Sequence, residues 1–401
     1  MRILSISVLS GLLFIQPAAA LTFQDFVQCV GATGTGAVCQ LDAGLYPVSQ
    51  TIVIGRSNIS IEGTSSSGGT TLQRASGFLG PLFQDNWPST PPIISVTFQN
   101  LTIDGNRANN LAVWSLYSPE VSIFGIKGMQ FLNCSFVNSP NIGLGLYGGG
   151  TSGVVVDHCY FANPVIYGLW SDALGDNSGI TYQECPKKHF VDHVIVENSQ
   201  FVNAGEPAIL GEMTNVWILH NVFTNNHSNS IPFGDSGGQI DLTVCTNNAV
   251  IWKNTFQNGS ASSNGQTADG IELHGTNTSV IDNIVNNNSG GGITMDGVQD
   301  IFVADSNSSQ GSFANSHSGI EIGHSSPSFR RTDWIVIDSA NSVGNQEWGI
   351  WSDTSNTTPT QPVNHLVVTN SCLSENVLGP TYFKNLGPDI TMLDNLVSGC
   401  K

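Results

Sequence analysis

Basic residues are scarce in this sequence. Its 401 residues include 12 lysines and arginines against 30 aspartates and glutamates, which gives a formal net charge of −18 at pH 7. A surface this acidic repels phosphate backbones and anionic lipid headgroups, so neither nucleic acid nor a membrane is an expected partner. Strongly anionic substrates such as polyuronates are disfavoured for the same reason, unless a local basic patch overrides the net charge.

The motifs of several common enzyme classes are also missing. The sequence contains no Ser nucleophile elbow, no phosphate-binding loop, no Cys-x-x-Cys pair and no His-Glu-x-x-His helix. Only 10% of the residues are charged, which argues against long amphipathic helices, while the 40% apolar content is too high for a disordered chain. We therefore expect a folded chain with little long helix.

The first twenty residues read as a targeting segment. One basic residue, Arg2, precedes an apolar stretch that ends in Ala18-Ala19-Ala20. This order predicts a cleaved secretory signal over residues 1–20, followed by a single domain over residues 21–401. No later apolar run approaches membrane-spanning length. We expect a secreted, extracellular protein.

The cysteines and glycosylation sequons fit an oxidising compartment. The chain has eight cysteines, and Cys29 with Cys39 and Cys372 with Cys400 are candidate disulfides that would staple the two ends of the fold. Together with the signal segment, nine Asn-x-Ser/Thr sequons favour a glycosylated protein secreted by a eukaryote. The sequons begin at Asn58, Asn100, Asn133, Asn226, Asn258, Asn277, Asn287, Asn307 and Asn356.

An internal repeat is the main structural signal. Each unit reads as a short apolar strand, a polar pair and a Phe, followed some residues later by a pair such as Gly-Ile or Gly-Leu. The clearest Phe positions are Phe136, Phe161, Phe201, Phe223 and Phe256. Units of roughly 22 to 40 residues with Val/Ile strands and Asn/Gly turns are typical of a parallel β-solenoid. Stacking the coils about 4.8 Å apart pairs every strand and buries a continuous core.

One column of the repeat predicts a ladder of inward Asn side chains. Such a ladder would satisfy the backbone groups of the turns. Its expected members are Asn221, Asn254, Asn283 and Asn370. Cys134 and Cys159 fall in one column of adjacent coils, where they are either bonded to each other or simply stacked.

The repeat pattern resembles the right-handed parallel β-helix of the pectin-lyase-like superfamily. The resemblance covers about residues 45–395 and implies an all-β, single-stranded parallel β-helix. It says little about chemistry, because that superfamily includes hydrolases, lyases, epimerases, esterases and binding proteins.

One face of the solenoid is expected to collect carboxylates. If the Ile or Leu after each repeat Gly points into the core, the next residue points outward. The first outward column is then Gly145, Trp170, Leu210, Asp241, Glu272, Thr294, Glu321 and Trp351. Two residues further on, the second column is Tyr147, Asp172, Glu212, Thr243, His274, Asp296, Gly323 and Asp353.

Paired carboxylates on neighbouring coils suit acid–base cleavage of a glycosidic bond. Asp241 and Glu272 are one coil apart, and Glu321 lies two coils beyond Glu272, so stacked repulsion should raise one pKa into the range of a general acid. We expect Asp241 and Glu272 to be the main pair of catalytic carboxylates, with Glu321 as the third candidate. His274 and Asp296 are expected to support them. The sequence does not show which carboxylate is the acid.

A narrower resemblance concerns residues 264–353, which look like the polygalacturonase-type glycoside hydrolases. Thr267-Ala268-Asp269-Gly270 is similar to that family's Asn-Thr-Asp-Gly motif, which implies a catalytic-region role for Asp269. The segment around His317 is similar to its Gly-His-Gly motif. However, Ser289-Gly290-Gly291 stands where the family has an Asp pair, and Trp351-Ser352-Asp353 replaces Arg-Ile-Lys. Pectin hydrolysis by that family's mechanism is therefore not expected.

These observations predict a secreted glycoside hydrolase acting on a neutral poly- or oligosaccharide. The expected substrate-binding residues are Trp170, Trp351, His317, His324 and Arg330. No cofactor is expected, although Ca²⁺ on the carboxylate cluster is possible. Two alternatives stay open: a lyase that uses Ca²⁺ and Arg330 on uronates, and a non-catalytic glycan- or wall-binding protein. The sequence leaves a monomer and a homo-oligomer equally open.

Overall fold

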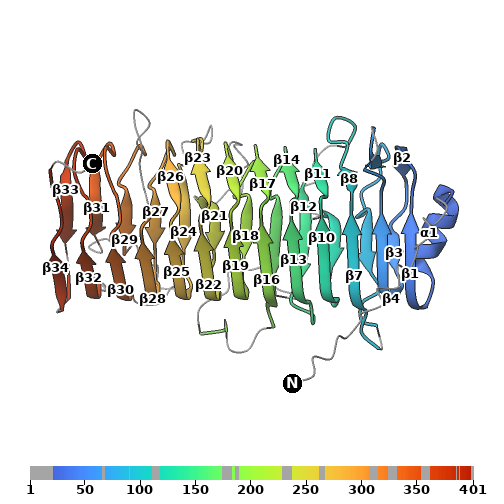
Figure 1. Ribbon diagram of the computed structural model, residues 1–401, viewed down its shortest axis with the longest axis horizontal. Coiled ribbons are helices and arrows are strands. Elements are labelled where there is room, and N and C mark those ends of the chain that lie inside the picture. The colour runs from blue at the N-terminus through green and yellow to red at the C-terminus, as the bar shows by residue number, and fades with distance from the viewer. Residues whose placement is uncertain are drawn as a thin grey trace, which may run out of the picture.

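The structure is a computed structural model. It describes residues 21–65, 68–89, 91–110, 118–173, 183–185, 189–227, 237–261, 267–306, 315–323, 332–353, 362–384, 386–387 and 389–398. The described strands stack as successive coils along one long axis (Figure 1). The expected signal segment, residues 1–20, lies outside the described residues.

Three parallel sheets form the walls of the coil stack. Sheet 1 has thirteen strands: β1 (Gly34–Gln40), β4 (Arg56–Glu62), β7 (Ile94–Gln99), β10 (Lys127–Leu132), β13 (Ser152–Asp157), β16 (Val191–Glu197), β19 (Met213–Leu219), β22 (Asn247–Trp252), β25 (Thr276–Ile281), β28 (Gln299–Ala304), β30 (Asp333–Asp338), β32 (Asn364–Thr369) and β34 (Ile390–Leu393).

Sheet 2 and sheet 3 complete each coil. Sheet 2 has nine strands: β2 (Gly44–Val48), β5 (Thr70–Arg74), β8 (Leu101–Asp104), β11 (Ser135–Val137), β14 (Tyr160–Ala162), β17 (Gln200–Val202), β20 (Val222–Thr224), β23 (Thr255–Gln257) and β26 (Ile284–Asn286). Sheet 3 has twelve: β3 (Ile52–Ile54), β6 (Phe83–Asp85), β9 (Pro119–Ile123), β12 (Ile142–Tyr147), β15 (Leu169–Asp172), β18 (Ile209–Gly211), β21 (Gly237–Leu242), β24 (Ala268–Leu273), β27 (Ile293–Met295), β29 (Ile320–Ile322), β31 (Trp348–Asp353) and β33 (Gly379–Lys384).

The Phe of each repeat forms a ladder in the core. Phe161 of β14 pairs in register with Phe136 of β11 and Phe201 of β17, and the series continues through Phe223 and Phe256. Successive rings are stacked with centroids 4.6 to 4.9 Å apart. All five rings are buried, so the period of the sequence repeat is the coil period.

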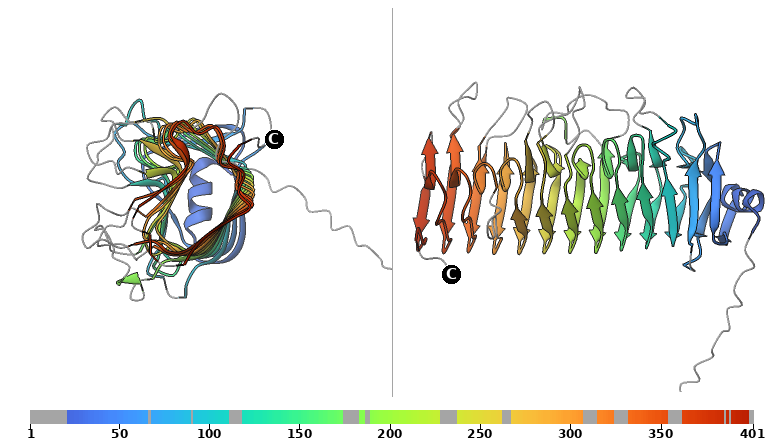
Figure 2. Two further views of the ribbon diagram at one scale, coloured as in Figure 1. Left: turned by 90° about the vertical axis from the view of Figure 1, so that its left-hand side faces the viewer. Right: turned by 90° about the horizontal axis from the view of Figure 1, so that it is seen from above.

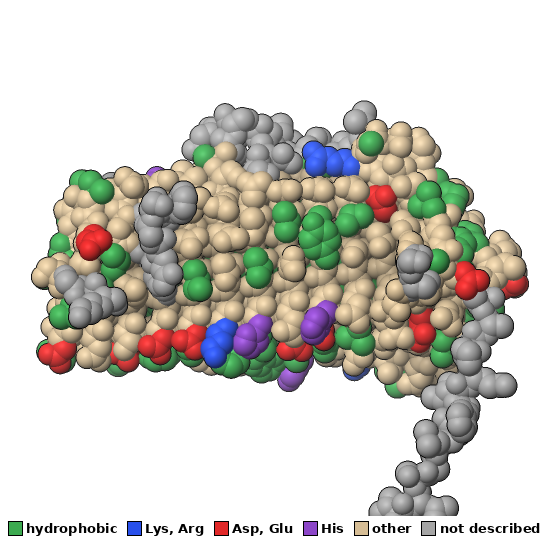
Figure 3. Space-filling model, turned by 45° about the horizontal axis from the view of Figure 1, so that its top comes forward, with side chains coloured by type: hydrophobic (Ala, Val, Ile, Leu, Met, Phe, Trp, Pro, Cys, Tyr) green, Lys and Arg blue, Asp and Glu red, His purple; other side chains and the backbone are tan. Residues whose placement is uncertain are grey.

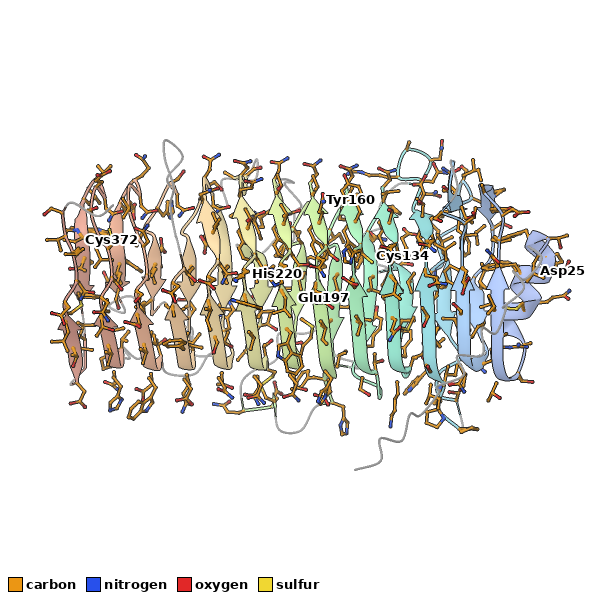
Figure 4. The ribbon with its side chains drawn as sticks, viewed as in Figure 1. Asp25, Cys134, Tyr160, Glu197, His220 and Cys372 are labelled. Carbon is orange, nitrogen blue, oxygen red and sulfur yellow. A yellow bond between two sulfur atoms is a disulfide. The ribbon has the colours of Figure 1, made fainter. Side chains whose placement is uncertain are left out.

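A left-handed residue and a polar ladder make the turn from sheet 1 to sheet 2. The turn residues Asn133, His158, Asn198, His220 and Lys253 all have positive φ. Figure 4 shows the labelled His220 at this turn. The side chain of the following residue points inward, and three such residues form the expected ladder: the Oδ1 of Asn254 accepts a hydrogen bond from the backbone N–H of Asn221 at 2.8 Å, and the Oδ1 of Asn283 accepts one from Asn254 at 2.9 Å.

The expected place of Asn370 in this ladder is wrong. Asn370 is itself a positive-φ turn residue, and its side chain donates to Asp338 at 2.8 Å. The neighbouring Ser371 takes the ladder position instead, accepting from the backbone N–H of Ala340. A side chain shorter than Asn can fill the column because a hydroxyl oxygen also accepts from a turn N–H.

A helix lies across one end of the stack. Helix α1 (Phe23–Gly31) is seen inside the coil outline in the end view of Figure 2. Its N-cap is Thr22, and its buried Phe26 and Val30 join the core. The expected Cys29–Cys39 disulfide links this helix to β1. The described chain contains no helix with the length and hydropathy needed to cross a bilayer.

The remaining cysteines depart in part from expectation. Cys134 and Cys159 are stacked and buried but not joined. A disulfide that the sequence analysis did not anticipate links Cys185 to Cys245. Cys372 is disulfide-bonded, as expected, while Cys400 lies outside the described residues.

One sequon is closed to glycosylation. Asn226 is fully buried; its Oδ1 accepts from the backbone N–H of Ala204 and its Nδ2 donates to Gln239. A glycan on this nitrogen would break both the packing and the hydrogen bonds. The sequons at Asn58, Asn133 and Asn277 have exposed side chains.

Candidate active site

The outer face of sheet 3 carries the expected row of site residues. The register runs from Leu210 to Asp241, Glu272, Thr294, Glu321 and Trp351 on six successive strands. Each of these residues follows a buried Ile, so the alternation of a strand turns it outward. Asp241, Glu272 and Thr294 are nevertheless each less than a tenth exposed. The site is therefore a sheltered strip.

Asp241, Glu272 and His274 form a compact group, here called the acid–His cluster. His274 Nε2 lies 2.9 Å from Glu272 Oε1 and 3.7 Å from Asp241 Oδ1. One ligand atom from each residue falls within 4.8 Å of the others. All three side chains are buried, so their electrostatic interactions are only weakly screened by solvent.

A backbone carbonyl sets the tautomer of His274. His274 Nδ1 lies 3.1 Å from the carbonyl oxygen of Asp296, which can only accept a hydrogen bond. Nδ1 therefore carries a proton. Nε2, which faces the carboxylates, either carries a second proton and donates it in a hydrogen bond or presents its lone pair. With the lone pair free, the three ligand atoms could hold a cation. The imidazole suits Zn²⁺ or a similar metal better than Ca²⁺, which prefers oxygen ligands.

A second group of carboxylates, here called the Asp269–Glu321 pair, lies on the same face. Asp269 Oδ1 accepts a hydrogen bond from the backbone N–H of Gly291 at 2.6 Å. Glu321 Oε1 accepts from the backbone N–H of Ser318 at 3.1 Å. Gly291 lies between the two side chains: its N–H donates to Asp269, and a Cβ at this position would lie 3.0 Å from Glu321 Oε1.

The pKa values of this pair are shifted by burial and by mutual repulsion. Burial raises the pKa of Glu321 well above its ordinary value, and the charges of Asp269, Glu347 and Asp296 raise it further. Burial also raises the pKa of Asp269, but the hydrogen bond from Gly291, the nearby hydroxyl of Thr294 and the charge of nearby imidazoles oppose that rise. Glu321 thus keeps its proton to a higher pH than an ordinary glutamate, and several neighbouring groups favour the ionised form of Asp269.

Glycine leaves the room that these carboxyl groups occupy. A Cβ on Gly291 would lie 3.0 Å from Glu321 Oε1 and 3.2 Å from Thr294 Oγ1. Gly291 belongs to the segment that stands where the polygalacturonase-type motif has its Asp pair. Here Glu321, from the next coil, fills the space that a side chain at position 291 would need.

The other expected site residues fall around these groups. His317 lies near Asp269 and opposes the rise in its pKa. Trp170 and Trp351 lie in the same outward row, on either side of the carboxylates, and both are half-buried. His324 and Arg330 lie outside the described residues.

Three contributors were missed by the sequence analysis. Thr294 was in the expected row, but its effect in lowering the pKa of Asp269 was not expected. Glu347 acts on Glu321 from the following coil, and its Oε2 lies 3.5 Å from the hydroxyl of Ser318. The buried His227, which lies 3.6 Å from Glu206, affects Asp269. No sequence signal marked Glu347 or His227, because both reach the site from turns rather than from the strand repeat.

Charged groups are sparse elsewhere on the visible surface. Figure 3 shows a face dominated by uncharged side chains, with acidic and His side chains confined mainly to a line along its lower edge. The concentration of buried carboxylates on sheet 3 is therefore a local feature of a chain that is only 10% charged.

No family model and no curated protein sequence matches this chain. Solved structures with similar folds do exist. The catalytic unit of a GH87 alpha-1,3-glucanase from Streptomyces thermodiastaticus superposes with a TM-score of 0.62 and 14% identity, over 94% of this chain and 65% of that one. The periplasmic alginate epimerase AlgG gives 0.61 and 13%, over 95% and 84%.

A third similar structure is not named as an enzyme. PfbA, a surface adhesin of Streptococcus pneumoniae, superposes with a TM-score of 0.57 and 14% identity, over 90% of this chain and 86% of that one. Identities this low carry information on the fold alone. Together with the three parallel sheets, they show that the chain has a parallel β-helix fold.

Proposed function

We propose that this protein is a secreted glycoside hydrolase that cleaves a neutral poly- or oligosaccharide on the outer face of sheet 3. The observation that carries the proposal is the Asp269–Glu321 pair, in which burial and repulsion raise the pKa of Glu321 well above its ordinary value beside a second carboxylate. One protonated and one ionised carboxyl group are what acid–base cleavage of a glycosidic bond requires.

Glu321 acts as the general acid in this proposal. It donates its proton to the glycosidic oxygen as the bond to the anomeric carbon breaks. Asp269 stabilises the positive charge that develops on the sugar ring and takes a proton from the water that adds to the anomeric carbon. The backbone N–H of Gly291 holds the Asp269 carboxylate in place.

The acid–His cluster is assigned to substrate binding rather than to proton transfer. Glu272 lies in contact with His274, so it is a weaker candidate for the acid than Glu321. Asp241 and Glu272 line the strip next to Glu321 and can accept hydrogen bonds from sugar hydroxyls. This differs from the sequence-based expectation, in which Asp241 and Glu272 are the main catalytic carboxylates.

A neutral substrate fits the charge of the strip. In the described outward row from Asp241 to Trp351 there is no lysine or arginine to balance a uronate. Buried carboxylates would repel an anionic sugar, whereas they accept hydrogen bonds from hydroxyl groups. Secretion is proposed on the targeting segment and on the disulfides, which persist in oxidising compartments.

The first experiment measures products from a panel of neutral and acidic polysaccharides. A hydrolase releases new reducing ends, without ultraviolet absorbance and with equal activity in chelator. Glu321→Gln and Asp269→Asn are each expected to lower kcat by about a hundredfold or more. Glu197→Gln, on sheet 1 and away from this face, is the matched control (Figure 4). Full activity in both site variants would refute the assignment.

A uronate lyase or epimerase is the second candidate. It is supported by the acid–His cluster, which could hold a cation to neutralise a uronate carboxylate, and by the fold shared with an alginate epimerase. A lyase produces chelator-sensitive ultraviolet absorbance on a uronate. Binding without any product, retained in Glu272→Gln, would instead favour a non-catalytic role such as that of the adhesin.

A further inference from the structure

A cavity lies on the N-terminal side of the candidate active site. It has a volume of about 630 Å³ and is lined by Trp87, Lys127, Gly149, His189, Phe190 and Asp192, among others. We call it the Trp87 pocket. Its volume is within the range of ligand pockets, about 300 to 1,000 Å³. It lies where strands of sheet 3 lead into strands of sheet 1.

Two glycines make the space for the indole of Trp87. A Cβ on Gly125 would overlap the ring, and one on Gly149 would lie 3.1 Å from its Nε1. Trp87 Nε1 also donates a hydrogen bond to the carbonyl oxygen of Gly149 at 3.2 Å. The ring is thus held on one side, yet the residue is 39% exposed. A fixed, exposed indole is a suitable stacking surface for a sugar ring.

Polar groups in the pocket suit hydroxyl groups. Asp192 accepts hydrogen bonds from Asn215 at 2.7 Å and Thr214 at 2.8 Å. Partial burial by itself would raise the pKa of Asp192. These hydrogen bonds outweigh it and hold the pKa of Asp192 below its ordinary value, so Asp192 stays a carboxylate. Lys127 offers an exposed ammonium group opposite in charge. One donor and one acceptor of opposite charge beside an indole match a neutral sugar.

An aromatic row connects the pocket to the active site. Trp87 lies 6.3 Å from Phe124, Phe124 stacks on Tyr147 at 4.3 Å, and Tyr147 meets the edge of Trp170 at 5.3 Å. Trp170 in turn pairs with Leu210, which pairs with Asp241. A smaller cavity of about 220 Å³ borders Phe124 and Tyr147. The row runs along the stack from coil to coil.

We propose that the Trp87 pocket is a distal subsite for the same neutral glycan chain whose glycosidic bond is cleaved at Glu321. The inference rests on the proposed function and adds to it that the substrate is an extended chain. The strand carrying Tyr147 is six coils from the strand carrying Glu321, about 29 Å at 4.8 Å per coil. A chain of several sugar units spans this distance and a disaccharide does not.

Affinity electrophoresis measures binding without requiring catalysis. Native gels containing soluble neutral glucans, mannans, xylans or galactans are run with the wild type, Trp87→Ala, Trp334→Ala and Glu321→Gln. Trp334 is the matched control, because it is a 54% exposed tryptophan at β30, six strands further along sheet 1 than β13, which lines the pocket. We expect one of these glycans to retard the wild type and Trp334→Ala equally.

Loss of the stacking surface should weaken binding by about tenfold in Trp87→Ala. Glu321→Gln should be retarded as strongly as the wild type. Added oligosaccharides should compete with the polysaccharide in the gel more strongly as their length increases, until they are long enough to reach the pocket. Equal retardation of Trp87→Ala and wild type, or no retardation by any neutral glycan, would overturn the subsite. Trp87-dependent binding without reducing-end release would support the subsite and reject the hydrolase.

Discussion

The raised pKa of Glu321 is the central property at the scale of single residues. Burial comes first among the causes of its raised pKa, and the charge of Asp269 adds to it. Both causes depend on the tertiary fold, because they require the carboxyl of Glu321 to be brought against Asp269 from another coil. An isolated Glu in the same local sequence would be ionised at neutral pH.

A bell-shaped pH dependence follows for the proposed hydrolysis. The acid form of Glu321 is needed, so kcat/KM should fall as pH rises through its raised pKa. Asp269 must be ionised, so kcat/KM should also fall as pH drops through a value above the ordinary 3.8 of an aspartate. Glu321→Gln should remove the alkaline limb. A pH profile of kcat/KM that keeps this limb in the variant would exclude Glu321 as the acid.

At the scale of elements, the turn ladders stabilise the joints between strands. Asn254 shows how: its Oδ1 accepts from the backbone and the side chain of Asn221, and its Nδ2 donates to the carbonyl of Ile218 at 2.8 Å. One side chain therefore satisfies two buried backbone groups of the preceding coil, the N–H of Asn221 and the carbonyl of Ile218. Such groups are expensive to leave unpaired.

Removing this ladder residue should destabilise the fold. Asn254→Ala is expected to lower the free energy of unfolding by about 1–3 kcal/mol for each buried group left unpaired. Urea unfolding followed by fluorescence provides the measurement. Gln130→Ala, at an exposed position of β10, should change stability by less than about 0.5 kcal/mol. Equal effects of both variants would contradict the role of the ladder.

A buried ion pair joins sheets 2 and 3 near the N-terminal end. Arg74 Nη2 of β5 lies 2.9 Å from Glu120 Oε2 of β9, and Ser139 donates to the other carboxylate oxygen. Burial raises the pKa of Glu120 to about 6 from 4.5, although Arg74 opposes the rise. The folded state therefore binds this proton more tightly than the unfolded chain.

The sign of the resulting pH effect is opposite to that of an ordinary salt-bridged carboxylate. Ionising Glu120 should cost the folded state about 2 kcal/mol above pH 6, a cost that is absent below pH 4.5. Urea unfolding between pH 4 and 7 measures this cost. The free energy of unfolding should fall more steeply with rising pH in the wild type than in Glu120→Gln. Parallel pH curves for the two proteins would show that Glu120 does not titrate in this window.

At the scale of the whole molecule, stacking decides which surface positions are accessible. The sequon at Asn226 is identical in form to those at Asn58 and Asn277, but the coil buries it. In protein secreted by a eukaryotic host, we expect glycans at the exposed sequons and none at Asn226. Mass spectrometry of peptides after glycosidase treatment tests this. A glycan at Asn226 in folded protein would contradict the packing of its side chain.

The coils and the outward row could be predicted from the sequence alone. A strand exposes alternate residues and the repeat recurs once per coil, so Asp241, Glu272 and Glu321 could be placed in one row before the structure was known. The Phe ladder was equally readable. Both features are local, because each coil repeats the same short pattern. The same reasoning failed at Asn370, where a shift of one residue exchanges the turn and ladder positions.

How separate coils meet depends on the tertiary fold. The hydrogen bond between Gly291 and Asp269, the Cys185–Cys245 disulfide and the Trp87 pocket all join segments of unequal length from different coils. Their side chains meet because of how turns and insertions fold back on the stack, which no strand periodicity encodes. The proton on Glu321 belongs to this second kind of property, since burial and a neighbouring charge exist only once the coils are stacked.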